Sequence, residues 1–153
     1  MKIFLFYIKQ NKTKNADEFE EHYLKKIKKN MRLEIIGITN KKKFSSKEQQ
    51  IKYEGNLIKQ KIGKEKYICF DKHGEKVTSE SFADMVYKTN KNINLIVGGA
   101  LGLSNDVKEN ASKIISFSDM EFSHEVFRVM LLEQIYRAYC ISVSYTHLRA
   151  HET

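Results

Sequence analysis

Glycine, hydroxyl and charged residues follow directly after apolar runs at several places in the second half of the chain, and these places could hold a ligand. The apolar run 93–97 stops at the glycine-rich sequence 98–102, and a second apolar run spans residues 113–118. His124 and Arg128 then stand at the start of a long helical pattern that is expected to end near Tyr139. Glycines permit tight turns that bring backbone N–H and C=O groups close to a ligand. We therefore interpret this part of the chain as a ligand site in outline.

The glycine-rich sequence is not diagnostic by itself. Its spacing is G-G-x-x-G, whereas a dinucleotide-binding site needs G-x-G-x-x-G after the first strand and an acidic residue about 20 positions later. A purely structural turn explains these glycines equally well. His124 and Arg128 lie one turn apart on the same side of the expected helix, but a capping or core role is an equal alternative for His124.

The elements that position these residues can be read from alternating apolar patterns. Strands alternating with helices predict an α/β layer with a mainly parallel central sheet. Ligands bind at the carboxyl ends of the strands in such sheets, so Phe70, Gly98 and Phe117 are expected at one edge. The expected strands are 1–8, 33–39, 66–71 (ending in a turn at 71–74) and 93–97, and the expected helices follow Asn15, span 47–62 and follow Ser79.

The charge of the chain is unevenly distributed. The formal net charge is +8, and residues 1–65 hold 17 Lys and Arg against 8 Asp and Glu. A basic half beside a neutral half predicts a polyanion-binding surface next to a small-molecule pocket. Lys41, Lys42 and Lys43 lie on an expected loop and could follow a phosphate backbone without reading its sequence. A lysine-rich surface that only contacts solvent is an equal alternative.

Composition narrows the class of protein further. With 153 residues and 41% apolar residues, the chain is expected to form one globular domain with its own core. It has no run of about 18 apolar residues and no signal-peptide pattern, so we expect a cytoplasmic protein that does not span a membrane. Cys69 and Cys140 lack metal-ligand spacing and are expected to be buried free thiols, and no metal site is expected.

The order of these motifs resembles the RlmH (YbeA) family of ribosomal RNA large-subunit methyltransferases, within the SPOUT class. The resemblance covers about residues 1–142 and is strongest over 93–140. It rests on Ile-Val-Gly-Gly-x-x-Gly-Leu at 96–103, Ser116-Phe117-Ser118, Phe122-x-His124-x-x-x-Arg128-Val129 and Glu133-Gln134-Ile135-Tyr136-Arg137-Ala138.

The resemblance implies a fold and an activity. The C-terminal part would form a deep trefoil knot, and two copies would form a homodimer. S-adenosylmethionine would be the cofactor, and the methyl group would be transferred to N3 of a pseudouridine in helix 69 of 23S rRNA on assembled ribosomes. The family's cofactor pocket corresponds here to Phe70, Gly98, Phe117, Ser118, Asp119, Met120, Glu121 and Phe122.

The resemblance also suggests roles for charged residues. Arg128 and Arg137 would contact RNA phosphates, together with Lys41, Lys42 and Lys43, or would pair with Glu133 in the dimer. A neutral His124 could remove the N3 proton of the pseudouridine as a catalytic base. A non-catalytic ribosome-binding protein of the same fold and a methyltransferase acting on tRNA are the alternative functions.

The family normally has proline where this chain has Ser123, and its C-terminal tail ends in Tyr-His and a basic residue. Here the C-terminus differs. Translation of a common transposon-library adapter in one reading frame gives Val-Ser-Tyr-Thr-His-Leu-Arg-Ala-His-Glu-Thr, which is the sequence of residues 143–153. We therefore expect one methyltransferase domain at 1–142 and a non-native tail at 143–153, and we assign no metal to the His147 and His151 pair within it.

Overall fold

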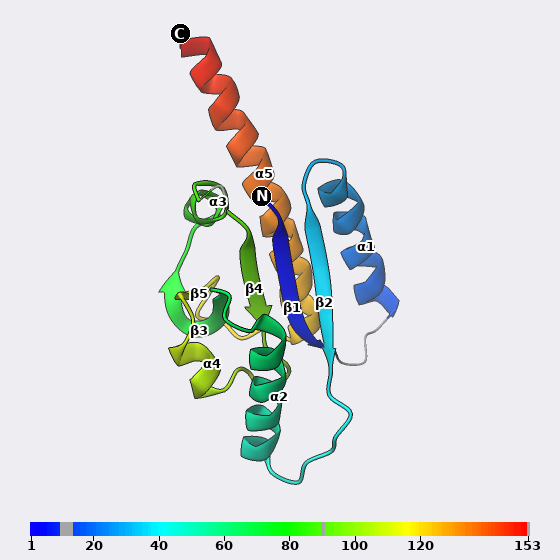
Figure 1. Ribbon diagram of the computed structural model, residues 1–153. Coiled ribbons are helices and arrows are strands. Elements are labelled where there is room, and N and C mark those ends of the chain that lie inside the picture. The colour runs from blue at the N-terminus through cyan, green and yellow to red at the C-terminus, as the bar shows by residue number, and fades with distance from the viewer. Residues whose placement is uncertain (10–13, 90, 153) are drawn as a thin grey trace.

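The computed structural model describes residues 1–9, 14–89 and 91–152, whose path is shown in Figure 1. Strands and helices alternate along most of the chain, as the sequence predicts. The elements are β1 (Ile3–Lys9), α1 (Lys14–Lys28), β2 (Leu33–Thr39), α2 (Lys47–Ile62), β3 (Ile68–Lys76), α3 (Ser79–Tyr87), β4 (Ile93–Val97), α4 (Asn105–Glu109), β5 (Lys113–Ser116) and α5 (His124–Glu152).

The strands form one sheet in the order β2-β1-β4-β3-β5, and every pairing between them is parallel. On the central strand β1, Ile3 pairs with Leu33 of β2 and with Ile93 of β4. The carboxyl ends of the strands therefore lie at one edge of the sheet. The predicted α/β class with a parallel central sheet is confirmed.

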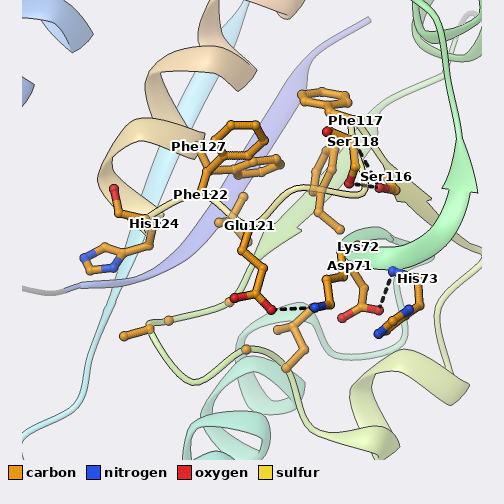
Figure 2. A pocket seen from close by; sticks show the side chains of 18 of the residues that line it. Asp71, Lys72, His73, Ser116, Phe117, Ser118, Glu121, Phe122, His124 and Phe127 are labelled. Atoms are coloured by element: carbon orange, nitrogen blue, oxygen red, sulfur yellow. Dashed lines mark hydrogen bonds and ion pairs between the residues drawn. The ribbon is translucent and has the colours of Figure 1, made fainter.

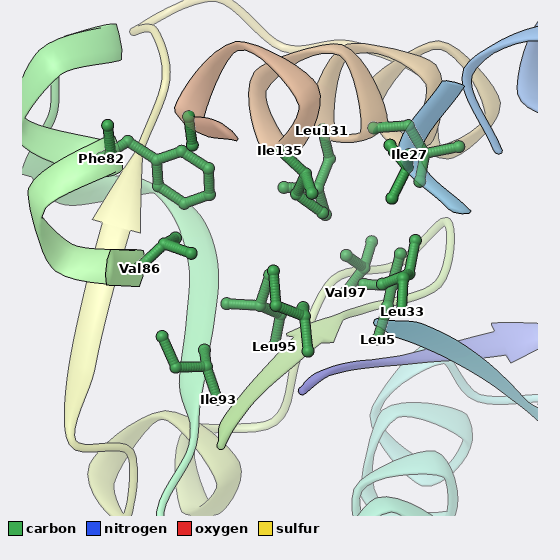
Figure 3. Close-up of a cluster of buried hydrophobic side chains, with 14 of the residues drawn as sticks. Leu5, Ile27, Leu33, Phe82, Val86, Ile93, Leu95, Val97, Leu131 and Ile135 are labelled. Carbon is green, nitrogen blue, oxygen red and sulfur yellow. The ribbon is translucent and has the colours of Figure 1, made fainter. Parts of the chain in front are cut away.

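Helices cover both faces of the sheet. Successive strand residues point to opposite faces, so Leu5 and Tyr7 belong to one buried cluster while Phe6 and Ile8 belong to the other. The cluster that contains Leu5 is closed by α1, α3 and α5, and the other is closed by α2 and α4. Figure 3 shows the first cluster, in which Ile27, Phe82, Val86, Leu131 and Ile135 of the helices face Leu5, Leu33, Ile93, Leu95 and Val97 of the strands.

Local chemistry explains where the helices begin and end. The Ser46 hydroxyl accepts a hydrogen bond from the N–H of Gln49 and so caps the start of α2. Gly63 ends this helix with a φ of 61°, a left-handed conformation that glycine adopts without strain. Thr78 and Ser81 form a reciprocal capping box at the start of α3.

Three element boundaries differ from the sequence prediction. β3 does not end at residue 71 but resumes its pairing with β5 beyond the expected turn. A short helix, α4, begins after Ser104 in a segment that showed only polar character, because the Ser104 hydroxyl caps it. α5 does not end near Tyr139 but continues to Glu152, since no proline or glycine interrupts it. Its C-terminal part projects beyond the sheet in Figure 1.

Two smaller expectations also need correction. The first helix begins at Lys14, so Asn15 lies inside it and not before it. Cys69 is buried as predicted, but Cys140 is exposed, because it lies on the outward side of α5. The trefoil knot implied by the family resemblance stays a prediction.

In the described ranges 1–9, 14–89 and 91–152, no helix is both long and apolar enough to cross a bilayer. Within those ranges, no three His, Cys, Asp or Glu side chains are grouped as metal ligands would be.

Candidate functional site

The glycine-rich sequence forms a tight turn directly after β4. The N–H of Gly102 donates a hydrogen bond to the carbonyl of Gly99 at 3.0 Å, and Gly102 has a φ of 86°. A Cβ at Gly98 would lie 2.9 Å from the backbone carbon of Gly102 and 3.0 Å from the Leu103 side chain. Glycine at 98 is therefore required by close packing, and this turn exposes backbone at the carboxyl end of a central strand.

α2 packs against the segment that follows this turn. Gly55 of α2 packs against Ser104, where an added Cβ would come within 2.5 Å of the Ser104 hydroxyl. The same hydroxyl accepts a hydrogen bond from the N–H of Val107 at 3.2 Å. The segment after the glycine turn is thereby held between α2 and α4.

A bulge in β3 forms the second wall of the site. Phe70 and Glu75 both align with Ile115 of β5, so residues 71–74 leave the ladder between them. The strands approach closely at Gly74, where a Cβ would lie 2.7 Å from the carbonyl oxygen of Ile114. The N–H of His73 donates to the Asp71 carboxylate at 3.1 Å, which stabilises the bulge.

The bulge, the glycine turn and the segment after β5 enclose an open pocket of about 560 Å³, within the usual range for small-molecule sites. Three phenylalanine rings, Phe70, Phe117 and Phe127, pack against one another with centroids 5.3–5.5 Å apart and give the pocket an apolar wall. Figure 2 shows the Phe117 and Phe127 rings on one side and Asp71, Lys72 and His73 of the bulge on the other.

The segment from Ser116 to Met120 is ordered by its own hydrogen bonds. The Ser116 hydroxyl donates to the carbonyl of Ser118 at 2.8 Å and accepts from its N–H at 3.2 Å. The N–H of Met120 donates to the Ser118 hydroxyl at 3.0 Å. This closely wound segment presents backbone groups beside the aromatic wall.

Two ion pairs tie this segment to β3. The Lys72 ammonium lies 2.6 Å from a carboxylate oxygen of Glu121, and Lys76 pairs with Asp119. The hydrogen bond between Lys72 and Glu121 raises the pKa of Lys72 and lowers the pKa of Glu121. Both groups are therefore charged at neutral pH.

Most of the predicted cofactor residues come together here. Asp119 is the exception, since it does not line the pocket and is engaged by Lys76 outside it. Asp71 was expected at the end of a strand without an assigned role in binding. Lys72 and His73 were missed, although their place directly after that strand was a usable signal. The predicted residues that line the pocket are Phe70, Gly98, Phe117, Ser118, Met120, Glu121 and Phe122, with His124 beside them.

His124 is the first residue of α5 and lies across the pocket from the bulge (Figure 2). The Ser123 hydroxyl accepts a hydrogen bond from the N–H of Val126 at 3.3 Å and so caps the start of α5. The Nε2 atom of His124 is buried and has no hydrogen-bond partner among the residues that the structure describes. This nitrogen is therefore available to a bound molecule.

The predicted RNA-contacting arginines lie in different settings. Arg128 is 4% exposed, with its Nε 3.2 Å from a Glu20 oxygen and its guanidinium 3.6 Å from the Tyr7 ring centroid. The structure thus buries Arg128 between α5 and α1, away from any surface that RNA could reach in this chain. Arg137 is exposed and pairs with Glu133 one turn away on the same helix, at 3.1 Å.

Lys41, Lys42 and Lys43 are exposed on the loop between β2 and α2 and do not line the pocket. The base of the loop is held by a hydrogen bond from the Asn40 amide to the Glu54 carboxylate at 3.0 Å. The Lys42 ammonium lies 5.0 Å from the centroid of the Tyr53 ring. This loop therefore presents positive charge at the same edge of the sheet as the pocket.

These features together fit a flat ring system joined to a charged chain. Aromatic side chains and a backbone turn without Cβ atoms favour a planar apolar group. The Asp, Glu and Lys side chains that line the pocket, Asp71, Lys72 and Glu121, lie on its bulge side, where a ligand's charged end would be matched.

The comparisons with known proteins agree with this geometry. The family described as "Predicted SPOUT methyltransferase" matches residues 1–146. The "Ribosomal RNA large subunit methyltransferase H" of Clostridium botulinum (strain Okra) is 41% identical over 131 residues, 79% of this chain and 82% of that protein. The "Ribosomal RNA large subunit methyltransferase H 1" of Clostridium perfringens (strain SM101) is 38% identical over 151 residues, 92% and 95% of the two chains.

A solved structure supports the fold. The crystal structure of tRNA (m1G37) methyltransferase from Aquifex aeolicus matches 89% of this chain and 69% of that chain with a TM-score of 0.54. At 15% identity this likeness concerns the fold alone.

The chain therefore belongs to the SPOUT methyltransferases and, within that class, to the family of the ribosomal RNA large subunit methyltransferases H. The resemblance inferred from the glycine turn and the His124-Arg128 segment is confirmed.

Proposed function

We propose that this protein is an S-adenosylmethionine-dependent methyltransferase acting on the RNA of the large ribosomal subunit. The observation that carries the proposal is the pocket at the strand ends, where the family's glycine turn, aromatic wall and hydroxyl segment meet. The names and coverage of the two clostridial relatives support the substrate class.

Each wall of the pocket has a role in binding the cofactor. The rings of Phe70, Phe117 and Phe127 exclude water from the adenine, and the backbone of residues 117–122 offers it hydrogen bonds. Gly98 lets the ligand approach the β4 backbone, since any side chain there would collide with the turn. When bound, S-adenosylmethionine supplies a methyl group carried on a positively charged sulfur.

His124 is the residue best placed to handle a proton. Its Nε2 atom is buried and unpartnered at the edge of the pocket. We assign it to accept the N3 proton of a pseudouridine in helix 69 of 23S rRNA, the target that the family resemblance implies. Loss of this proton leaves N3 with the electron pair that the methyl group needs.

The RNA would be held beside the pocket by exposed cations. Lys41, Lys42 and Lys43 lie on one loop at the carboxyl edge of the sheet and suit phosphate contacts. Arg137 is exposed beside Glu133 and can serve either RNA or a second chain. Because the RNA would be part of the assembled ribosome, we place the protein in the cytoplasm.

A homodimer and a trefoil knot are part of the same proposal. Phe19 of α1 is 60% exposed and Val126 of α5 is 51% exposed, and Met120 and Phe122 are also exposed at the pocket mouth. Large apolar side chains left in water suggest a covering partner. We assign that partner to a second copy of this chain.

Two measurements on the purified protein test the function. Isothermal titration calorimetry with S-adenosylmethionine should give saturable binding at one site per chain. Radiolabelled methyl transfer should then be found with ribosomes and not with free tRNA. Absence of cofactor binding would favour a non-catalytic ribosome-binding protein, and transfer to tRNA alone would overturn the rRNA assignment.

The role of His124 is tested separately. His124→Ala should lower single-turnover methyl transfer by about 100-fold or more, the usual contribution of a general base. Calorimetry of the same variant should give cofactor affinity close to that of the wild type. Full single-turnover transfer by this variant with saturating cofactor would exclude the base assignment.

A further inference from the structure

One ion pair in the pocket joins two segments that are far apart in the sequence. The Lys72 ammonium on the β3 bulge lies 2.6 Å from the Glu121 carboxylate on the segment before α5. Both side chains line the pocket, and both remain in contact with solvent. In Figure 2 this pair crosses the pocket on the side away from the Phe117 ring.

We propose that Lys72 and Glu121 bind the amino-acid end of the cofactor, with Lys72 holding its carboxylate and Glu121 its ammonium group. This inference rests on the proposed function, because it assumes that S-adenosylmethionine occupies the pocket. The α-amino and α-carboxylate groups of this ligand form a zwitterion. A zwitterion placed between the two side chains replaces one ion pair by two, so no charge is left unmatched.

The polarity of the pocket fixes the direction of the ligand. The interior is formed by phenylalanine rings and by Val97, Leu103 and Ile115, which cannot stabilise a charged end. The adenine must therefore lie inward and the amino-acid end outward, at the bulge.

Other charged groups near this end are already engaged. The Asp71 carboxylate accepts the N–H of His73 and lies 3.7 Å from the Lys108 ammonium. His73 is exposed on the bulge, and its backbone N–H is held by the Asp71 carboxylate. Lys72 and Glu121 are thus the pair that can exchange partners most easily.

The neighbouring pair Lys76–Asp119 provides a matched control. It joins the same two segments, β3 and the segment before α5, but neither residue lines the pocket. If the ion pairs only held the two segments together, loss of either pair would change the affinity for every ligand by the same factor. A direct contact with the zwitterion would instead depend on which groups the ligand carries.

The test measures calorimetric affinities at pH 8 for three ligands and three variants. The ligands are S-adenosylmethionine, its decarboxylated form, and 5′-methylthioadenosine, which lacks the amino-acid end. The variants are Lys72→Met, Glu121→Gln and the control Lys76→Met. Circular dichroism melting of each variant confirms that the chain is folded.

The expected pattern is specific to each chemical group. Lys72→Met should weaken the affinity for S-adenosylmethionine about fivefold, as expected for a solvent-exposed charged contact. The affinities for the other two ligands should not change. Glu121→Gln should weaken the affinities for S-adenosylmethionine and its decarboxylated form by a similar factor. The affinity for 5′-methylthioadenosine should not change. Lys76→Met should alter none of the three.

Other results would overturn the inference. Equal losses of affinity for all three ligands would show that the ion pair only holds the two segments together and does not contact the ligand. A loss of affinity with Lys76→Met as large as with Lys72→Met would show the same. Unchanged affinities throughout would remove both residues from the site. If the wild-type protein binds none of the three ligands, the proposed function itself fails, which is a distinct outcome.

Discussion

The ion pairs Arg128–Glu20 and Lys72–Glu121 use the same chemistry in two different regions of the molecule. Arg128 and Glu20 are both about 5% exposed between α5 and α1, and the guanidinium also covers the Tyr7 ring. Lys72 and Glu121 lie at the open rim of the pocket with side chains 39% and 77% exposed. Charges taken out of water must keep their partners, whereas charges in water can exchange them.

This difference separates the residues that hold the fold from those that meet a ligand. α5 belongs to both regions: it begins with His124 in the pocket and buries Arg128 one turn later. A sequence motif that contains both residues therefore combines two functions. Variants in each region should affect different measurements.

The largest effect is expected from breaking the buried pair. Arg128→Ala should lower the free energy of unfolding by about 3 kcal/mol or more, because it removes a buried cation that pairs with the buried Glu20 carboxylate. Urea unfolding followed by circular dichroism measures this. The exposed pair gives the control, since Arg137→Ala should cost about 0.5 kcal/mol or less.

The double variant Glu20→Leu with Arg128→Met sharpens the result. Replacing both charges by apolar side chains should recover most of the lost stability. An Arg128→Ala protein as stable as the wild type would show that this pair does not hold α5 to α1.

A side chain in the glycine turn should affect binding more than stability. Gly98→Ala places a Cβ within 2.9 Å of the Gly102 backbone, so the turn must shift at a cost of about 1–3 kcal/mol. We expect loss of measurable cofactor binding in calorimetry.

Gly63→Ala is the matched control for that variant. Gly63, unlike Gly98, has a positive φ, and no atom lies within 4 Å of a Cβ added there. It follows the C-terminal end of α2, away from the glycine turn. Gly63→Ala should lower the free energy of unfolding by about 1 kcal/mol through backbone strain and leave the cofactor affinity unchanged. Equal binding by the Gly98→Ala and wild-type proteins would contradict the assigned role of the turn.

The loop lysines should affect RNA affinity and leave cofactor affinity unaltered. Replacing Lys41, Lys42 and Lys43 by alanine should reduce the salt dependence of ribosome binding by about two to three units of log K per log salt, roughly one for each phosphate contact. The same triple change at Lys61, Lys64 and Lys66, which are exposed towards the other edge of the sheet, is the control. Identical slopes for both triple variants would remove the loop from the RNA surface.

The smallest effect is expected at the C-terminus. We propose that the domain is 1–142 and that residues 143–153 are not native, because they match a translated adapter. A chain ending at Ser142 should therefore have an unchanged melting temperature. A chain ending at Tyr136 should be destabilised, since it loses the buried Ala138. Genomic DNA that encodes 143–153 at this locus would contradict the proposal.

The sequence predicted the parts of the fold that depend on periodic apolar patterns. The residues of β2, α2 and β4 were expected at their observed positions because each combines such a pattern with a clear boundary, as Gly63 shows for α2. A turn at 71–74 was expected, but not that β3 resumes its pairing with β5 after it. That pairing depends on the close approach of Gly74 to Ile114, a contact between distant segments. The Lys72–Glu121 pair depends on the same long-range register.

The sequence indicated where the pocket lies, but it identified only some of the side chains that line it. Parallel topology brings Phe70, Gly98 and Phe117 to one edge, and the family motif added His124. Burial is a tertiary property, however, so the motif could not distinguish the pocket residue His124 from the core residue Arg128 on the same helical side.

The central claim is that this chain transfers a methyl group from S-adenosylmethionine to large-subunit rRNA. Its most direct test incubates the protein and labelled cofactor with ribosomes that lack this modification, then analyses digested 23S rRNA by mass spectrometry. We expect one added methyl group per ribosome, on N3 of a pseudouridine in helix 69. Unmodified 23S rRNA, despite demonstrated cofactor binding, would contradict it.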